Sequence, residues 1–450
     1  MNDVINEIIK AAGINNVLTD NEHLIIYRKG SIDRMEKIPL CVVKITDENI
    51  ISRVLKIASK YHLNVIARGG GSSPTGAVVP VENTIVLDMR PLNNIRVNFK
   101  DGYVEAYAGA TLQEVNNECM KYGYFFPPDP SSVSTATVGG AVNENSGGMR
   151  CARYGVVKDW VLKLDCVLAN GEETSFGETI YKNRGGFNLV DLICGSEGTL
   201  CIVKKAYLKI LGLPGKIYRI AGFYDNIDDA MDAILKIRML NPLILEFADY
   251  YGIAAANKIK RFNYPEVNGG MVLVDTDFSQ DDFNKIKNII EERAMKIVVP
   301  QGKEFDEIFE IRRIAFAAPG LLYPGFIDGD IVVPISRLSE ALKGIDDIRR
   351  KYNVYIATCG HAGDGNLHPQ VGADPGEQWN NAVSAMNEIN MLAIKLGGSV
   401  SGEHGIGKTK IGMLKEQFRY KNQEKSLYFM NKIKKIFDPD NILNRGDFID

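Results

Sequence analysis

One ten-residue stretch, residues 360–369, constrains the fold of its neighbourhood most strongly. It contains Asp364-Gly365 between two extended runs. This pair is a strong hairpin signal, because a two-residue turn needs a positive φ that glycine adopts at little cost. Counting outward from the turn places His361 opposite His368, and opposed side chains lie ~4.5–5.5 Å apart at Cβ. The stretch therefore predicts either a metal-binding hairpin or two structural histidines on a surface turn.

The metal interpretation gains weight because the chain has only five histidines. A third one, His404, follows Glu403 directly. His361, His368 and Glu403 make a two-histidine, one-carboxylate set, which leaves coordination positions open for substrate. Such nitrogen and oxygen ligands suit Zn, Mn or Fe alike. We expect His404 to act as a general base; the alternative is a residue that caps a helix or turn.

A glycine-rich loop, residues 68–76, follows a short buried strand expected at 65–67. Glycines let backbone N–H groups approach phosphate oxygens, and hydroxyl side chains add donors. The loop is neither a Walker A motif nor the Gly-x-Gly-x-x-Gly turn of a Rossmann fold. It therefore indicates a phosphate-binding loop of another kind, or else a flexible surface loop.

Two more segments are rich in glycine and other small residues. Both follow a loop at 125–132 that prolines make rigid. Residues 135–148 are rich in small side chains and contain two Gly-Gly pairs, and residues 195–203 are again glycine-rich. Small residues at this density indicate that a flat or bulky group lies against the backbone.

Together these segments resemble the flavin-binding domain of the vanillyl-alcohol oxidase / para-cresol methylhydroxylase (PCMH) superfamily. Within it, the resemblance is to the glycolate oxidase flavin subunit and to D-lactate dehydrogenases. It implies FAD, with residues 68–76 at the pyrophosphate, residues 129–135 and 138–145 along the isoalloxazine and ribityl chain, and residues 197–203 in backbone contact. The cofactor-binding residues that it implies are Arg68, Gly69, Gly70, Gly71, Ser72, Ser73, Gly76, Pro128, Asp129, Ser132, Thr135, Val138, Gly139, Gly140, Asn145, Gly147, Gly148, Gly155, Glu197, Gly198, Ile202 and Asn444.

Two departures from the family pattern bear on the cofactor. Some relatives attach the flavin covalently through a histidine, where this chain has Ser72. We therefore expect FAD to be bound non-covalently. Many relatives also read Asn-Pro-Gly-Lys in the C-terminal tail, where this chain reads Asn444-Arg445-Gly446-Asp447, so the lysine is missing and Arg445 is the candidate to replace it.

The resemblance also implies the reaction. The divalent metal would sit on His361, His368 and Glu403, and Arg312 would hold the substrate carboxylate, although a solvated arginine on a helix face is the alternative. A small D-2-hydroxy acid would lose its hydroxyl proton to His404 and a hydride to flavin N5. Relatives that act on five-carbon dicarboxylates add a lysine where this chain has Asp328. D-lactate or glycolate is therefore the expected substrate, which would leave as the 2-oxo acid.

Other functions stay open at this point. One is a D-2-hydroxyglutarate-type dehydrogenase. Another is a non-redox flavoenzyme similar to alkylglycerone-phosphate synthase, although that chemistry uses adjacent histidines and the chain has no His-His pair. A third is a non-catalytic electron-transfer subunit, which would not need the histidine and glutamate set.

The predicted fold class is α+β. Helices are expected at 2–12, 47–61 and 111–122, and strands at 85–88 and 103–107. From about residue 217, strands alternate with helices, which predicts an antiparallel sheet with helices on one face. By resemblance, residues 1–214 form a two-lobed PCMH-type FAD-binding domain and residues 215–397 form a ferredoxin-like cap domain. Residues 398–450 would return to the flavin as a C-terminal helical segment.

Composition excludes several classes of protein. A net charge of −3 without a dense basic run argues against nucleic-acid binding. We expect no transmembrane segment and no secretory signal. Seven scattered cysteines predict a reducing cytoplasm and no iron–sulfur cluster within the chain. The electron acceptor stays open between an iron–sulfur subunit, a quinone and a cytochrome, and so does peripheral membrane attachment through a partner.

Overall fold

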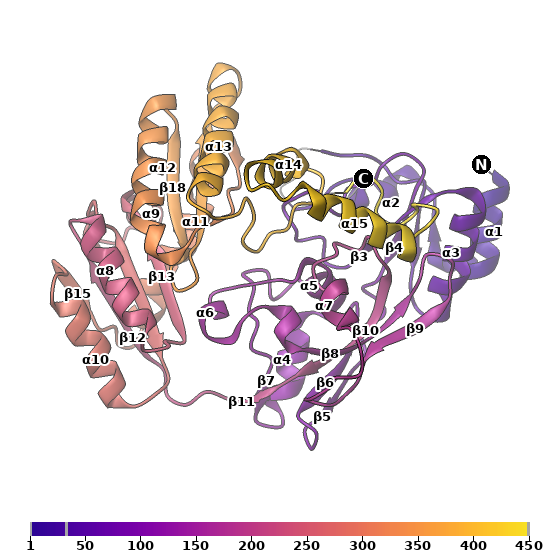
Figure 1. The fold of residues 1–450 in the computed structure, drawn as a ribbon, viewed down its shortest axis with the longest axis horizontal. Helices are drawn as coiled ribbons and strands as arrows, with labels where there is room; N and C mark the ends of the chain where they lie inside the picture. Colours follow the sequence, from indigo (N-terminus) through magenta and orange to yellow (C-terminus); the bar gives the residue numbers. More distant parts are fainter. Residues whose placement is uncertain (1, 32–34, 448–450) are drawn as a thin grey trace. The chain divides into compact units, whose positions relative to one another are not determined.

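The computed structural model describes residues 2–31 and 35–447, and the chain divides into two compact units. The first unit is built from Met1–Gly147, Val156–Leu213 and Glu403–Asp450, and the second from Gly148–Gly155 and Pro214–Gly402. The N-terminal and C-terminal segments, indigo and yellow in Figure 1, thus belong to the same unit.

The first sheet of the first unit has four strands in the order β1-β2-β4-β3. The strands are β1 (Val17–Leu18), β2 (Cys41–Lys44), β4 (Thr84–Asp88) and β3 (Asn64–Arg68). The central strand β4 pairs in parallel with both neighbours and is buried along its whole length. Helices α1 (Asn2–Ala12) and α3 (Asn49–Tyr61) contribute their apolar faces to the same core. In α3 the buried residues recur at helical spacing, which explains why this segment forms an amphipathic helix.

The second sheet is antiparallel, with five strands in the order β5-β6-β10-β8-β9. The strands are β5 (Ile95–Asn98), β6 (Tyr103–Tyr107), β10 (Ile202–Lys209), β8 (Val161–Val167) and β9 (Glu173–Gly177). In β6 only alternate residues are buried, as expected for a strand with one face on a core. Helix α4 (Leu112–Met120) starts at a capping box formed by Thr111 and Glu114.

A short helix, α5 (Val138–Glu144), lies within the small-residue segment, where no helix was expected. Thr137 caps its N-terminus by accepting a hydrogen bond from the backbone of Gly140. A Cβ atom on Gly139 would lie 2.8 Å from Cβ of Ala108, so glycine is required there for close packing. The first unit also contains the shorter elements α2 (Asn21–Leu24), β7 (Tyr124–Phe125), α7 (Leu189–Ile193) and β11 (Leu211–Gly212).

The second unit is organised around an antiparallel sheet in the order β15-β12-β14-β13-β18-β19-β16, with β17 also paired to β19. Its strands are β12 (Tyr218–Phe223), β13 (Ile244–Ala248), β14 (Met271–Thr276), β15 (Lys296–Val298), β16 (Gly325–Ile327), β17 (Ile331–Val332), β18 (Tyr355–His361) and β19 (Asn366–Ala373). Two separate apolar cores flank this sheet.

Helices cover both faces of this sheet, so the expectation of helices on one face was wrong. One core takes residues from α8 (Ile227–Arg238), α10 (Gln280–Glu291), α12 (Leu338–Tyr352) and α13 (Glu377–Lys395). The other takes residues from α9 (Tyr250–Lys260) and α11 (Glu304–Leu322), together with the partly buried Tyr154 of α6 (Cys151–Tyr154). A strand that is covered on both faces has no solvent-facing side, so its sequence does not alternate between apolar and polar residues. In β13 and β14, for example, every residue is buried.

Other expectations agree closely with the structure. The helix at 2–12 and the strand at 103–107 have the predicted bounds. The fold class is mixed α and β, as predicted. Among the described residues, no helix is both long enough and apolar enough to span a bilayer.

The C-terminal segment of the first unit contains α14 (Ile411–Tyr420) and α15 (Glu424–Phe437). The buried ammonium of Lys434 in α15 donates to Asp438 Oδ2 (2.5 Å), Thr199 O (2.9 Å) and Leu443 O (2.8 Å). Asp438 in turn accepts from the backbone N–H groups of Ile442 and Leu443. A parallel bridge then pairs Leu443 with Val65 of β3. A single buried ion pair thus ties the tail to both the 195–203 loop and the first sheet.

We predict that Lys434→Met destabilises the protein by about 3 kcal/mol, because Asp438 stays buried without its charge partner. Urea unfolding should show the loss as a lower midpoint. Lys435→Met is the matched control, since Lys435 is exposed in the same helix, and it should change stability by less than about 0.5 kcal/mol. Equal midpoints for the two variants would contradict the assigned role of Lys434.

Candidate active site

The histidine hairpin differs in register from the prediction. His361 pairs with Asn366, and His368 pairs with Cys359, so the connection is residues 362–365 and not a two-residue Asp-Gly turn. The backbone N–H groups of Asp364 and Gly365 both donate to His361 O at 3.1 Å.

Tertiary contacts explain the longer connection. Gly363 N donates to Leu245 O (3.1 Å), and Val333 N donates to Gly365 O (3.0 Å). A Cβ atom at Gly365 would lie 2.2 Å from Val333 O, and the backbone φ there is +87°. Both the close approach and the positive φ therefore require glycine at this position. The two imidazoles nevertheless lie on the same face, with ring centroids 5.2 Å apart.

Glu246 of β13 holds the first imidazole in place. Its Oε1 lies 2.7 Å from Nδ1 of His361, and its Oε2 accepts from Nε of Arg312 at 2.6 Å. Burial alone would raise the pKa of the Glu246 carboxyl, but the charges of His361 and Arg312 outweigh burial and hold that pKa below its ordinary value. When the imidazole is neutral, an Nδ1–H donated to this carboxylate leaves Nε2 of His361 as the lone-pair nitrogen, the arrangement of metal-binding histidines.

Arg312, expected to bind the substrate carboxylate, is buried in α11 and engaged with protein groups. Besides Glu246, it contacts Cys359 Sγ at 3.2 Å through Nη1. Its neighbour Arg313 is exposed and pairs with Glu310. The structure thus connects Arg312 to His361 through Glu246. Sequence reasoning missed Glu246, although a lone carboxylate in an otherwise apolar strand was a signal for it.

Asp330 organises the second half of the cluster. It is fully buried and accepts from Asn366 Nδ2 (2.9 Å), Ser401 Oγ (2.8 Å) and Gly402 N (3.0 Å). Its Oδ1 lies 3.9 Å from Nδ1 of His368, which is longer than a hydrogen bond. Gly402 is joined to Glu403 by one peptide bond, so the Cα atoms of these residues lie about 3.8 Å apart. Asp330, also missed, therefore fixes the backbone immediately before Glu403.

The Glu403–Gly407 segment is held within the first unit by another buried acid. Glu197 accepts hydrogen bonds from the backbone N–H groups of Ile406 (2.7 Å) and Gly407 (2.6 Å). The hydroxyl of Thr75 donates to the carbonyl of His404 at 3.3 Å. Nε2 of His404 lies 3.6 Å from Oε1 of Glu403. The predicted base and its neighbour thus sit on a loop that Glu197 clamps.

Several acids gather around this loop. Burial, reinforced by the charge of Asp447 and opposed by His404 and Lys408, raises the pKa of Glu144 to about 8. Burial followed by the charges of Asp447 and Glu144 also raises the pKa of Glu197. Lys408, which sequence reasoning did not single out, supplies positive charge at this cluster.

The glycine-rich loop at 68–76 packs tightly on the segment that follows the proline loop. A Cβ atom at Gly69 would lie 1.9 Å from Thr137 Oγ1, and one at Gly70 would lie 1.9 Å from Thr135 O. These two glycines are therefore required by contact between the two predicted cofactor segments. Gly71 and Gly76 have positive φ, as turns require.

The predicted cofactor residues fall mostly in the first unit. Gly148 and Gly155 are the exceptions and belong to the second unit, as do His361, His368 and Arg312. Asn444 is engaged with protein groups, since Nδ2 donates to Glu197 O and Asp447 Oδ2 and Oδ1 accepts from Lys408. Arg445 donates to the carbonyls of Asn441 and His62.

Buried polar atoms in the first unit test whether FAD fits. Among the described residues, Asn143 Oδ1, Glu144 Oε2 and Ser196 Oγ are buried without a hydrogen-bond partner. These atoms belong to the two small-residue segments, at 135–148 and 195–203. Buried polar atoms are normally satisfied, so a bound group that supplies donors and acceptors fits here.

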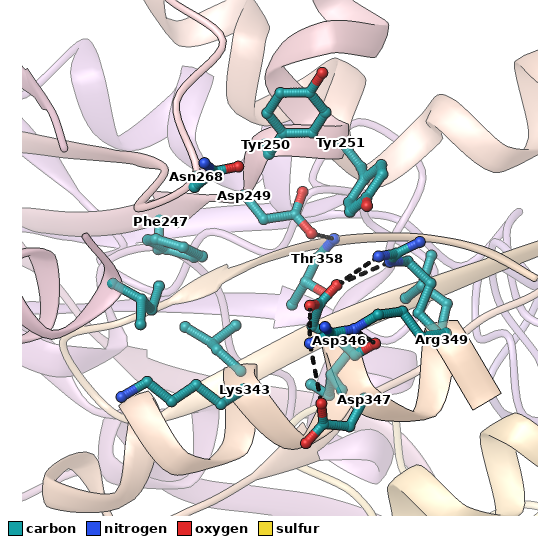
Figure 2. Close-up of a pocket in the computed structure, with 15 residues that line it drawn as sticks. Phe247, Asp249, Tyr250, Tyr251, Asn268, Lys343, Asp346, Asp347, Arg349 and Thr358 are labelled. Atoms are coloured by element: carbon teal, nitrogen blue, oxygen red, sulfur yellow. Dashed lines mark hydrogen bonds and ion pairs between the residues drawn. The ribbon is translucent and has the colours of Figure 1, made fainter. Parts of the chain in front are cut away.

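A pocket of about 750 Å³ lies elsewhere in the second unit, between α12, the end of β13 and β18 (Figure 2). Thr358 lines it, whereas Cys359, which contacts Arg312, points to the opposite face because side chains alternate along a strand. Charged residues at the pocket form ion pairs with other protein side chains, such as Arg349 with Asp346 and Lys343 with Asp228. This pocket is therefore separate from the histidine cluster.

The comparisons with known proteins agree on one family. Residues 39–177 match the FAD binding domain family, and residues 215–448 match FAD linked oxidases, C-terminal domain. The chain is 33% identical to glycolate oxidase subunit GlcD of Bacillus subtilis (strain 168), covering 99% of this chain and 96% of that protein. It is 30% identical to D-lactate dehydrogenase of Archaeoglobus fulgidus, covering 91% of each.

Solved structures share the fold at lower identity. p-Cresol methylhydroxylase aligns with a TM-score of 0.79 at 15% identity, covering 100% of this chain and 96% of that one. Alkyldihydroxyacetonephosphate synthase aligns with a TM-score of 0.74 at 18% identity, covering 99% and 84%. These identities establish a common fold only.

Asp249, one of the residues that line the pocket, leads to a prediction about pH. Burial, partly offset by hydrogen bonds from Gly252 and Thr358, raises its pKa from 3.8 to about 7. Between these pH values the folded state keeps a proton that the unfolded state has lost, so stability falls as pH rises. Asp249→Asn removes this effect. From pH 4 to pH 7, wild type should lose on the order of 3 kcal/mol relative to the variant, measured by urea unfolding. Parallel pH profiles would refute the shift.

Proposed function

Because the chain belongs to the FAD-linked oxidase family, we propose that it oxidises a small D-2-hydroxy acid, D-lactate or glycolate, to the 2-oxo acid. One observation carries the proposal beyond the family. Two buried imidazoles, His361 and His368, lie 5.2 Å apart, and the first is oriented by a buried carboxylate. An imidazole pair with such support is the arrangement that a divalent metal needs.

Glu403 would complete the ligand set, since the Asp330 contact fixes the residue before it. A two-histidine, one-carboxylate set leaves positions for a chelating hydroxyl and carboxylate, and Zn, Mn or Fe would suit it. A bound ion would supply Lewis acidity at the substrate hydroxyl, and FAD would supply the two-electron acceptor. The chain's own residues then have to hold the substrate and move its proton.

His404 is the proposed base for the hydroxyl proton. An imidazole has an ordinary pKa of ~6.5 and is mostly neutral at pH 7, so it can accept a proton. The Thr75 and Glu197 contacts fix the backbone that directly follows its side chain. Arg312 is the proposed carboxylate partner, acting together with its Glu246 contact.

A small monocarboxylate fits better than a dicarboxylate. At the position where relatives of the dicarboxylate type carry a lysine, Asp328 accepts a hydrogen bond from Gln370 Nε2 at 2.6 Å. A second substrate carboxylate near Asp328 would meet repulsion. The named relatives, a glycolate oxidase subunit and a D-lactate dehydrogenase, agree with this substrate class.

Electrons would leave the flavin to an external acceptor. All seven cysteines are free, and all but Cys151 are buried. A reducing compartment such as the cytoplasm suits such thiols. An iron–sulfur subunit, a quinone or a cytochrome would each serve as acceptor.

Anaerobic mixing of the FAD-loaded protein with D-lactate or glycolate tests the proposal. The flavin absorbance band should bleach with one of these substrates, and a chelator should slow bleaching until Zn, Mn or Fe is restored. His404→Ala should slow bleaching by about 10²–10⁴-fold without loss of bound FAD. His62→Ala, which removes an exposed histidine, should match wild type. Bleaching within a few-fold of wild type in His404→Ala would exclude this residue as the base.

FAD should be released when the protein is denatured, because Ser72 stands where relatives attach the flavin through histidine. Precipitation with acid should leave the yellow colour in the supernatant and a colourless pellet. Reloading the refolded protein with free FAD should restore the absorbance. Colour retained in the washed pellet would show a covalent bond.

A further inference from the structure

Helix α15 presents two chemically different faces. Its inward face carries Lys434, held by the buried ion pair with Asp438, and Phe437, whose ring lies 6.1 Å from that of Phe176. This face anchors the helix to the first unit. The opposite face does not take part in these anchoring contacts.

The outward face is a single stripe of basic and large apolar residues. At 100° per residue, its members lie within an arc of about 120°, centred roughly opposite Lys434. The exposed fractions of Tyr428, Phe429 and Ile436 are 57%, 60% and 77%. The stripe consists of Lys425, Tyr428, Phe429, Lys432, Lys435 and Ile436.

Charge is concentrated on this part of the chain. Without Lys434, which is buried and paired with Asp438, residues 411–437 contain six Lys and Arg residues against two Glu residues, a net charge of +4. The whole chain has a net charge of −3, so the remainder carries −7. Tyr420, Lys415 and Arg419 are likewise exposed on α14. A basic, partly apolar surface on an otherwise acidic protein indicates an anionic partner.

We propose that the outward face of α15 docks the protein on an anionic lipid surface. Lysine stems can lie along the acyl boundary while their ammonium groups reach lipid phosphates, and exposed aromatic side chains enter the same layer. Lysine is depleted in protein–protein interfaces, so its interleaving with Tyr428 and Phe429 favours lipid over an acidic protein. The contact is peripheral and reversible, and it is independent of the proposed redox reaction.

Co-sedimentation of the FAD-loaded full chain with vesicles tests the proposal. We expect binding to phosphatidylcholine vesicles that contain phosphatidylglycerol, little binding to pure phosphatidylcholine, and weaker binding at about 0.5 M than at about 0.05 M salt. The triple variant Lys425→Glu, Lys432→Glu, Lys435→Glu should bind roughly a hundredfold more weakly. Tyr428→Ser with Phe429→Ser should bind about tenfold more weakly.

The matched control changes the same charge on the second unit, with Lys285→Glu, Lys287→Glu and Lys296→Glu. It should bind vesicles like wild type, and FAD content and urea midpoints should show that all variants are folded. Equal losses in the two triple variants would show that net charge alone is responsible and would overturn the proposal. So would wild-type protein that ignores anionic vesicles, including the case in which α15 captures an acidic protein instead.

Discussion

Burying a carboxylate such as Glu246 costs several kcal/mol of free energy unless its charge and lone pairs are satisfied. Here Arg312 and His361 satisfy both oxygens, so three elements, β13, α11 and β18, are tied at one point. If any of the three elements shifted, a buried charge would lose its partner. The orientation of the His361 imidazole is therefore set by the fold of the second unit, before any ligand binds.

Buried charged side chains hold three other segments in the same way. Asp330 holds the hydroxyl of Ser401 and the backbone N–H of Gly402, Glu197 holds the backbone of Ile406 and Gly407, and Lys434 holds the tail. Loops rich in glycine and serine bury little apolar surface, so hydrophobic packing cannot position them. Buried charges can position such loops through directional hydrogen bonds, and here they fix the residues on both sides of Glu403-His404.

Sequence patterns predicted what depends on neighbours along the chain, such as the β6 strand and the α1 helix. They failed where distant strands decide. The Asp364-Gly365 pair carries a two-residue turn signal, but hydrogen bonds from Val333 and to Leu245 draw residues 362–365 out of the ladder. Glu246 escaped notice for the same reason, because its importance depends on an arginine 66 residues away in sequence.

Glycine content by itself does not identify the flavin site. Gly69 and Gly70 are required because Thr137 and Thr135 occupy the space of their absent side chains. The chain would need these glycines even if the loop bound nothing. What points to a ligand is the opposite kind of evidence, polar atoms buried without partners at Asn143, Glu144 and Ser196. Close approach explains the glycines, whereas the orphaned atoms need a hydrogen-bonding partner, which a bound polar group would supply.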